Sequence, residues 1–355
     1  MARHHETDHP DRSVRPAAAR PRLRTLTAVT AAATLTATAA LAGCGGSSSG
    51  GSSGGKIKIG LITKTETNPF FVKMRQGASK QAAASGATLM TASGEYDGDN
   101  ESQVTAIENM VAAGVKGILI TPNDSKAIVP AIQRAKQRDV VVIALDTPTE
   151  PQNATDALFA TNNFKAGQLI GEYAKAKMAG KPAKIATLDL APGISVGILR
   201  HNGFLQGFGV KAGDPSVVCS QDTQGDQAKG QTAMENCLQK APGINVVYTI
   251  NEPAALGAYN ALKAKGLEKK VLVVSVDGGC TGTRAVQSGE IAATSQQYPL
   301  KMAQDGVAAV VSYAKTKKKP SGYTDTGVTL IAAKPVSGVE SKDTKLGTEL
   351  CWGKK

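Results

Sequence analysis

Short apolar runs alternate with amphipathic stretches along the chain from residue 57 onward, and this alternation restricts the possible folds most. The run IKIGLIT at 57–63 is rich in β-branched residues and predicts a buried strand. Pro69 suits the first position of the helix that follows. The pairing recurs, with strands predicted at 87–92, 117–121 and 140–145 and helices at 69–85, 101–113 and 125–137. Strands separated by such helices form βαβ units, which predicts a parallel sheet.

A second series of the same kind begins with a strand-like segment at 157–161. Its predicted strands are 184–189, 216–219, 245–250, 271–276, 291–296 and 326–333. Its predicted helices are 164–179, 194–208, 227–240, 253–265, 282–288 and 299–316. The 355 residues therefore predict an α/β fold with two similar halves, each long enough to bury its own core.

Several predicted strands are followed directly by a polar residue. Asp146 comes after VVVIAL, Asn251 after VVYTI, Asp277 after VLVVSV and Gln297 after IAATSQ. One such residue alone is usually a cap or a turn former. In open α/β sheets, however, ligands bind outside the carboxyl ends of the strands. If the two halves face each other, these four side chains would converge on one crevice.

The turn after the first strand adds Lys64 and Asn68, with Phe70 and Phe71 close behind. One interpretation makes Asn68 a helix N-cap and buries both rings in the core. The other places all four at the crevice. Carboxylates and amides beside aromatic rings suit a neutral polyol, because hydroxyls pair with the polar groups and apolar sugar faces pack on rings.

The chain is poor in groups that enzymes need. After His9 the only histidine is His201, on a predicted helix where we expect a surface position. No G-x-G-x-x-G follows strand 57–63, which argues against a nicotinamide cofactor. The acidic run that begins at Asp97 resembles a calcium loop, but Ser102 stands where that loop requires glycine. These features predict a binding protein that is not an enzyme and uses no cofactor or metal.

The first 43 residues have the pattern of an export signal. A basic segment at 1–24 precedes an Ala/Thr/Leu-rich segment at 26–42, and Leu41-Ala42-Gly43-Cys44 looks like a bacterial lipobox. We therefore expect a signal peptide over 1–43 and a lipid on the sulfur of Cys44. A transmembrane anchor is the alternative, although the apolar segment is short and rich in Ala and Thr. Residues 44–55, mostly Gly and Ser, predict a flexible linker between the lipid and the folded body.

Four cysteines follow Cys44, and an even count in an exported chain suggests two disulfides. Three connectivities are possible. We favour Cys219–Cys237, which would join a strand end to the next helix, and Cys280–Cys351, which would fix the C-terminal tail. Free buried thiols are the alternative.

The net charge of +12 is spread along the chain. One cluster occurs at Lys315, Lys317, Lys318 and Lys319, where we expect a solvated helix end. No basic stripe interleaved with aromatic residues is present, so nucleic acid is not expected as a partner.

The chain resembles the periplasmic-type sugar-binding proteins of ABC transporters, of the ribose-binding-like kind, over nearly all of residues 56–335. Within that family it is most similar to fructose-binding proteins. The stretches that carry the resemblance are GLITKTETNPFF, GEYDGDN, GILITPND, VIALDTP, VVYTINEPAALGA, VSVDGGC and ATSQQYP.

The resemblance implies an α/β periplasmic binding protein type I fold, in which two Rossmann-like lobes with parallel sheets are joined by a three-segment hinge. The crossovers are expected near 158–162, 291–297 and 326–331. The N-terminal lobe would then comprise 56–158 and 297–326, and the C-terminal lobe 159–296 and 327–355.

The resemblance also implies roles for single residues. The family's sugar contacts match Asn68, Phe70, Phe71, Asp146, Asn251, Asp277 and Gln297. The chain departs from the ribose-type pattern at a few positions. Thr147 stands where ribose-type sites have Arg, and Lys64 where they have Ser. A helix arginine is displaced to Arg200, which either contacts the sugar or only packs the lobe, and Gly225 replaces a stacking Phe.

The expected function is an exported, monomeric receptor, lipid-anchored to the outer face of the bacterial cytoplasmic membrane. It would capture a monosaccharide, fructose first, and deliver it to an ABC permease. The alternative is a receptor for ribose or another small furanose or polyol, including one with a signalling role.

Overall fold

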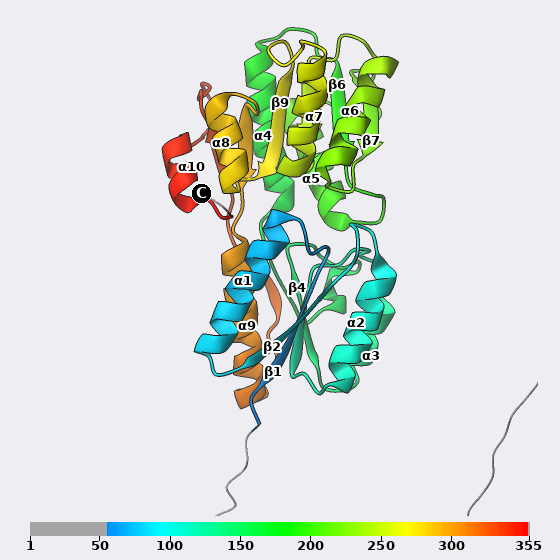
Figure 1. Cartoon of the computed structure of the whole chain (residues 1–355), viewed down its shortest axis with the longest axis vertical. Coiled ribbons are helices and arrows are strands. Elements are labelled where there is room, and N and C mark those ends of the chain that lie inside the picture. Colours follow the sequence, from blue (N-terminus) through cyan, green and yellow to red (C-terminus); the bar gives the residue numbers. More distant parts are fainter. Residues whose placement is uncertain (1–54, 354–355) are drawn as a thin grey trace, which may run out of the picture. The chain divides into compact units, whose positions relative to one another are not determined.

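The computed structural model describes residues 55–353. The expected signal peptide, the expected lipid attachment site at Cys44 and the linker up to residue 54 lie outside the described residues. Within residues 55–353, the chain forms two six-stranded sheets, each covered by helices on both faces, and Figure 1 shows them one above the other. We call the two parts built on these sheets the N-terminal and the C-terminal lobe.

The N-terminal lobe is built on strands that all run parallel. They are β1 (Lys58–Thr63), β2 (Thr88–Ser93), β3 (Gly117–Ile120), β4 (Val141–Leu145), β5 (Ala157–Ala160) and β11 (Gly322–Asp325). Their order across the sheet is β11-β5-β4-β3-β1-β2. Helices α1 (Pro69–Ala84) and α9 (Pro299–Thr316) cover one face, and α2 (Asn100–Ala112) and α3 (Val129–Lys136) cover the other.

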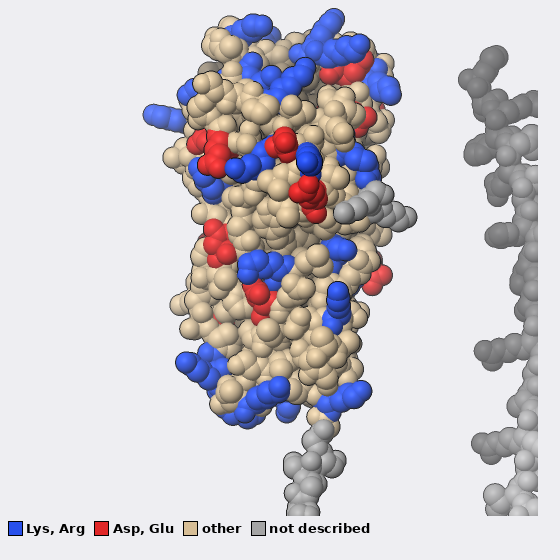
Figure 2. Space-filling model, turned by 90° about the vertical axis from the view of Figure 1, so that its left-hand side faces the viewer, with Lys and Arg blue, Asp and Glu red and all other residues tan. Residues whose placement is uncertain are grey.

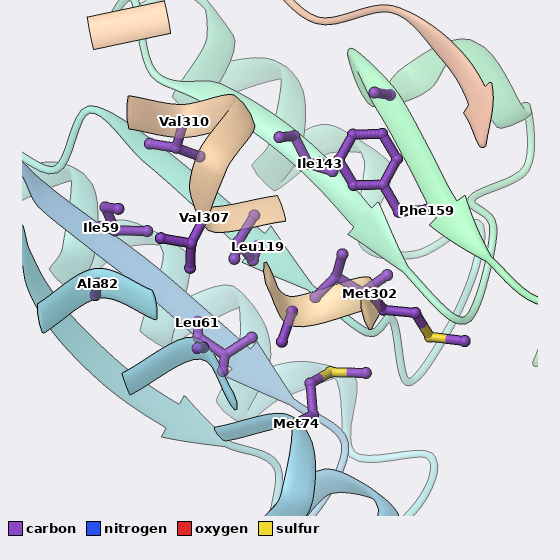
Figure 3. Packing of buried hydrophobic residues seen from close by; sticks show 14 of the residues in the cluster. Ile59, Leu61, Met74, Ala82, Leu119, Ile143, Phe159, Met302, Val307 and Val310 are labelled. Carbon is purple, nitrogen blue, oxygen red and sulfur yellow. The ribbon is translucent and has the colours of Figure 1, made fainter. Parts of the chain in front are cut away.

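The strands of this lobe are apolar along their whole length because both faces of the sheet are buried. Figure 3 shows Ile59 and Leu61 of β1 packed among Met74 of α1 and Val307 of α9. Ile62, the next residue along β1, points to the opposite face and belongs to the core under α2 and α3. The continuous apolar runs seen in the sequence follow from this two-sided burial.

The C-terminal lobe repeats the arrangement with one antiparallel strand at its edge. Its strands are β6 (Ile185–Asp189), β7 (Val217–Asp222), β8 (Val246–Thr249), β9 (Leu272–Asp277), β10 (Ala293–Gln296) and β12 (Thr329–Ala332), in the order β12-β10-β9-β8-β6-β7. Strand β12 runs antiparallel to β10, and the other pairs are parallel. Its helices are α4 (Asn163–Met178), α5 (Ser195–Phe208), α6 (Gln227–Lys240), α7 (Glu252–Ala264), α8 (Cys280–Ser288) and α10 (Thr344–Leu350).

The chain passes between the lobes three times. It crosses from β5 to α4 at 161–162, from β10 to α9 at 297–298 and from β11 to β12 at 326–328. The N-terminal lobe thus includes α9 and β11, which follow most of the C-terminal lobe in the sequence. The predicted fold class, two α/β lobes joined by three segments, is confirmed.

Most predicted elements agree with the structure, and two of them, α6 and α9, have the predicted bounds. The predicted strand at 326–333 was wrong in its first residues, because 326–328 form the third crossover and only 329–332 are β12. Strand β11 was not predicted, because all four of its residues are exposed and carry no apolar signal. Helix α10 was not predicted either, since it is only 7 residues long and buries one glycine.

Both expected disulfides are present in the structure. Cys219 in β7 bonds to Cys237 in α6, and Cys280 at the start of α8 bonds to Cys351 just after α10. No helix described between residues 55 and 353 is both long and apolar enough to cross a membrane. Figure 2 shows Lys and Arg side chains over the whole length of one face, with Asp and Glu side chains among them.

Candidate functional site

The carboxyl ends of the strands in both lobes meet at a small inner cavity. Nine of the ten sequence-predicted contact residues line it: Lys64, Asn68, Phe70, Phe71, Asp146, Arg200, Asn251, Asp277 and Gln297. The tenth, Thr147, does not line the cavity. Its hydroxyl donates to Asp146 Oδ2 at 2.8 Å and so supports a residue that does.

Arg200 is the central cation of the site and is buried. Its Nη2 lies 3.5 Å from Asp146 Oδ1 of the N-terminal lobe, and its Nη1 lies 3.5 Å from Asp277 Oδ1 of the C-terminal lobe. The guanidinium also donates to Asn163 Oδ1 at 2.8 Å and to the carbonyl of Ile250 at 3.0 Å. Arg200 therefore faces the cavity while its other donors are held by fixed protein acceptors.

Four glycines place Arg200 by letting α4 and α5 pack backbone against backbone. A Cβ at Gly167 of α4 would lie 2.0 Å from the carbonyl oxygen of Arg200 itself. Gly171, Gly203 and Gly207 are equally tight, with 2.1–2.3 Å to backbone oxygens of the facing helix. No side chain fits between the two helices here. The four glycines therefore allow α5 to pack closely on α4, and this close packing determines where Arg200 lies.

Asp146 follows β4 directly and Asp277 is the last residue of β9, and both have positive φ, 62° and 135°. A non-glycine residue in this region is strained, and such strain is concentrated at functional sites. Burial raises the pKa of the Asp277 carboxyl, while Arg200 and the Nε2 of Gln297, which donates to Asp277 Oδ1 at 2.7 Å, oppose that shift. Two carboxylates from different lobes are thereby aimed at one guanidinium.

Lys64 brings a second cation into the cavity from the N-terminal lobe. Its Nζ is buried and lies 3.8 Å from Asp97 Oδ1, which is too long for a hydrogen bond. Burial lowers the pKa of Lys64 and raises the pKa of Asp97, and each partner's charge opposes the other's shift. Neither Lys64 Nζ nor Asp97 Oδ1 has a hydrogen-bond partner among the described residues.

Asn68, Phe70 and Phe71 combine both roles that the sequence suggested for them, helix capping or core packing and lining of the crevice. Asn68 caps α1, since its Oδ1 accepts from the backbone N–H of Phe70 at 3.0 Å. The rings of Phe70 and Phe71 meet edge to face at 5.3 Å and belong to the N-terminal core. The same residues line the inner cavity, so capping, core packing and lining are combined in one short segment.

Asn251 has a similar double role in the C-terminal lobe. Its Oδ1 caps α7 by accepting from Ala254 N at 3.1 Å, and its Nδ2 donates to the carbonyl of Gly225 at 3.0 Å. The side chain is thereby fixed at the cavity edge.

Within residues 55–353, no group of three or more His, Cys, Asp or Glu side chains is arranged to hold a metal ion.

Comparison with known proteins fits this geometry. A family model described as a periplasmic binding protein domain matches residues 59–319. The chain belongs to this periplasmic binding protein family. It is 34% identical over 250 residues to a ribose import binding protein of Bacillus subtilis, covering 70% of this chain and 79% of that protein. It is 28% identical over 264 residues to a D-allose-binding periplasmic protein of Escherichia coli, covering 73% and 85%.

A solved structure shows the same architecture. A periplasmic solute-binding protein of an ABC transporter from Actinobacillus succinogenes, with bound D-allose, superposes with a TM-score of 0.70 and 28% identity. The match covers 83% of this chain and 100% of that one.

Four residues that line the inner cavity of this periplasmic binding protein were not predicted from the sequence: Asp97, Leu190, Val196 and Ile250. Asp97 had a usable signal, because it follows β2 closely and stands in the stretch GEYDGDN. No sugar contact was expected in that stretch, although it is one of those that carry the family resemblance. The three apolar residues carry no polar signal, and nothing in the sequence distinguishes them from core.

The inner cavity has a volume of about 30 Å³, far below the roughly 300–1,000 Å³ typical of ligand pockets. A wider outer cleft of about 820 Å³ adjoins it and shares Asn68, Asp97 and Asp277 with it. Elsewhere the lobes touch through Ser125 and Ser195, whose hydroxyls lie 2.9 Å apart. The inner cavity is too small for a monosaccharide, so the residues that line it must move apart before one can bind among them.

Proposed function

We propose that this periplasmic binding protein is a receptor that captures a monosaccharide between its lobes and delivers it to an ABC permease. One observation carries the proposal. Lys64 Nζ, Asp97 Oδ1 and Gln297 Oε1 are buried polar atoms on residues that line the inner cavity, and none has a hydrogen-bond partner among the described residues. Leaving such atoms unpaired costs about 1–3 kcal/mol each, so a bound polar ligand would recover that free energy.

The mixture of groups suits a neutral polyol better than an ion. Cations at Lys64 and Arg200 stand beside three carboxylates, at Asp97, Asp146 and Asp277, so neither charge sign dominates the cavity. Sugar hydroxyls both donate and accept, and can therefore pair with all of these groups. The rings of Phe70 and Phe71 offer an apolar surface for a sugar face.

Ligand capture would work by lobe closure. Asp146 and Lys64 come from the N-terminal lobe, whereas Asn251 and Asp277 come from the C-terminal lobe. A sugar that pairs with both sets binds the closed arrangement more tightly than the open one and shifts the population toward it. The closed form is what a permease would recognise.

For the sugar itself we propose fructose, with ribose or allose as the second candidate. Fructose is supported by the overall likeness to fructose-binding proteins and by Lys64 and Thr147, which depart from the ribose-type pattern. The second candidate is supported by relatives named for ribose and D-allose. We further propose that the protein is exported and held by a lipid on Cys44, on the basis of the sequence pattern at 1–55, and that it acts as a monomer.

Titration calorimetry with D-fructose, D-ribose, D-allose and D-glucose tests the proposal. Saturable heat with one of these sugars at micromolar concentration or below is expected, and the rank order identifies the ligand. Absence of heat with every sugar, together with turnover of any of them, would contradict a transport receptor.

A variant tests the role of the unpaired atoms. Lys64→Met/Asp97→Asn removes both charges together, so that neither is left buried alone. Loss of a charged hydrogen bond should weaken sugar binding by roughly 10- to 150-fold. Lys116→Met is the matched control, because Lys116 is exposed in the same lobe. Equal affinity in the double variant and the control would remove the inner cavity as the binding site.

A further inference from the structure

The C-terminal tail places the only tryptophan of the chain, Trp352, in the lining of the outer cleft, next to the inner cavity. Trp352 follows α10 and is 5% exposed. It belongs to the hydrophobic cluster of the N-terminal lobe, although α10 packs against α8 of the C-terminal lobe. Figure 1 shows α10 beside α8, close to the start of α1.

Trp352 touches two residues that line the inner cavity. Its ring meets the ring of Phe70 at a steep angle of 75°, with centroids 5.4 Å apart. Its Nε1 donates to the carbonyl of Gln297 at 2.9 Å. Phe70 lines the inner cavity from α1 of the N-terminal lobe, and Gln297 lies in the second crossover. The indole therefore contacts both a cavity-lining ring and a segment that joins the lobes.

The same residue is held firmly to the C-terminal lobe. Its carbonyl accepts from the backbone N–H of Cys280 at 2.8 Å. Its neighbour Cys351 is disulfide-bonded to Cys280 across 71 residues of sequence. Gly279 makes room for the indole, because a Cβ there would lie 3.3 Å from two ring atoms.

We propose that Trp352 is a positioning residue of the ligand site. The Cys280–Cys351 disulfide fixes it to one lobe, and its own contacts hold the ring of Phe70 and the backbone of Gln297 in place. This inference rests on the proposed sugar-binding function and adds to it that a tail residue, which lines the outer cleft but not the inner cavity, controls affinity. Because Trp352 is hydrogen-bonded to Cys280 of the C-terminal lobe and Phe70 belongs to the N-terminal lobe, we expect lobe movement to change the contact between the two rings.

Two substitutions separate the ring from its hydrogen bond. Trp352→Leu removes both contacts, and an aromatic pair is worth enough that sugar affinity should fall about 3- to 10-fold. Trp352→Phe keeps a ring beside Phe70 and loses only the Nε1 donor, so it should recover part of the loss. The probes are D-fructose, D-ribose and D-allose, titrated into the whole protein by calorimetry.

Two further measurements keep the inference testable if Trp352→Leu fails to fold. The emission of the single tryptophan should shift when a sugar saturates the unmodified protein. Cys280→Ser/Cys351→Ser should weaken sugar binding, whereas Cys219→Ser/Cys237→Ser, which removes the disulfide remote from the site, should not.

The outcomes distinguish the inference from the function on which it rests. If the unmodified protein binds none of the three sugars, the proposed function fails and the inference fails with it. If it binds one, but tryptophan emission does not change and the Trp352 and Cys280/Cys351 variants bind equally well, only the positioning role is overturned.

Discussion

The guanidinium of Arg200 lies 3.5 Å from a carboxylate oxygen of Asp146, although the two residues belong to different lobes. Both side chains are buried, so water screens the pair weakly. Asp277 stands at the same distance on the other side of the guanidinium. The pair therefore links the lobes at the position where the proposed ligand would bind.

Arg200→Met tests this link. Removal of the guanidinium leaves two buried carboxylates without their cation, which should lower the free energy of unfolding by about 3–5 kcal/mol. Sugar binding should become too weak to measure at micromolar protein. Urea unfolding and calorimetry report the two effects. Arg134→Ala is the control, because its pair with Glu108 is exposed and should contribute no more than about 1 kcal/mol. Similar losses of unfolding free energy and sugar affinity in both variants would show that Arg200 stabilises the protein no more than an exposed ion pair does.

Gly203→Ala probes the close packing of α4 on α5. Alanine favours a helix over glycine by about 1 kcal/mol. Overpacking costs about 1–3 kcal/mol or more, and here the new Cβ would lie 2.1 Å from the carbonyl oxygen of Phe164. The clash is with backbone and should win, giving a net destabilisation in urea unfolding and a loss of sugar affinity as Arg200 shifts. Gly55→Ala, with open space around it, should be neutral. A more stable Gly203→Ala protein would mean that the helices can separate freely.

Cys219→Ser/Cys237→Ser should reduce stability without reducing affinity. The disulfide closes a loop with a sequence separation of 18, and in the chain-entropy model such a loop contributes about 3 kcal/mol. Both sulfurs are buried in the C-terminal lobe and neither residue lines the cavity. Thermal unfolding should show the loss, while the sugar Kd stays within about twofold of the parent value. A parallel fall in affinity would indicate that the disulfide shapes the site.

His201 should make stability depend on pH. It is half-buried, and its Nδ1 lies 2.9 Å from Asp189 Oδ1, a hydrogen bond that raises the pKa of the imidazole. The folded state therefore holds the proton more tightly than the unfolded state. The resulting stabilisation, about 0.5–1 kcal/mol for a partly exposed pair, is complete below pH 6.5 and lost as pH rises through the folded pKa.

Urea unfolding of the parent and of His201→Gln over this pH range measures the effect. The parent should lose stability relative to the variant as pH rises. Identical pH profiles would show that Asp189 does not hold a charged imidazole in the folded state.

The sequence predicted the fold well because its signals were local. Continuous apolar runs such as VVIAL of β4 are typical of strands buried on both faces, and capping residues such as Asn251 marked the helix starts. The polar residues at strand ends also came together in space, because a parallel sheet brings its carboxyl ends to one edge. That rule does not depend on which side chain follows the strand.

The remaining features depend on contacts that no local pattern encodes. The position of Arg200 follows from glycines on two helices, and the meeting of Lys64 with Asp97 depends on how two loops fold over the sheet. No local sequence pattern indicated that Trp352 lies at the site, since its partner Phe70 is 282 positions earlier in the sequence. Such long-range packing appears only when the lobes are assembled.

The three crossovers also determine when each lobe can be completed as the chain emerges from the ribosome. Met302, Val307 and Val310 of α9 fill the core under α1, and β11 closes the edge of the same sheet. Both elements come after nearly the whole C-terminal lobe in the order of emergence. The lobe that begins first along the chain is therefore completed late, and its sheet lacks its edge strand until residue 325 has been synthesised.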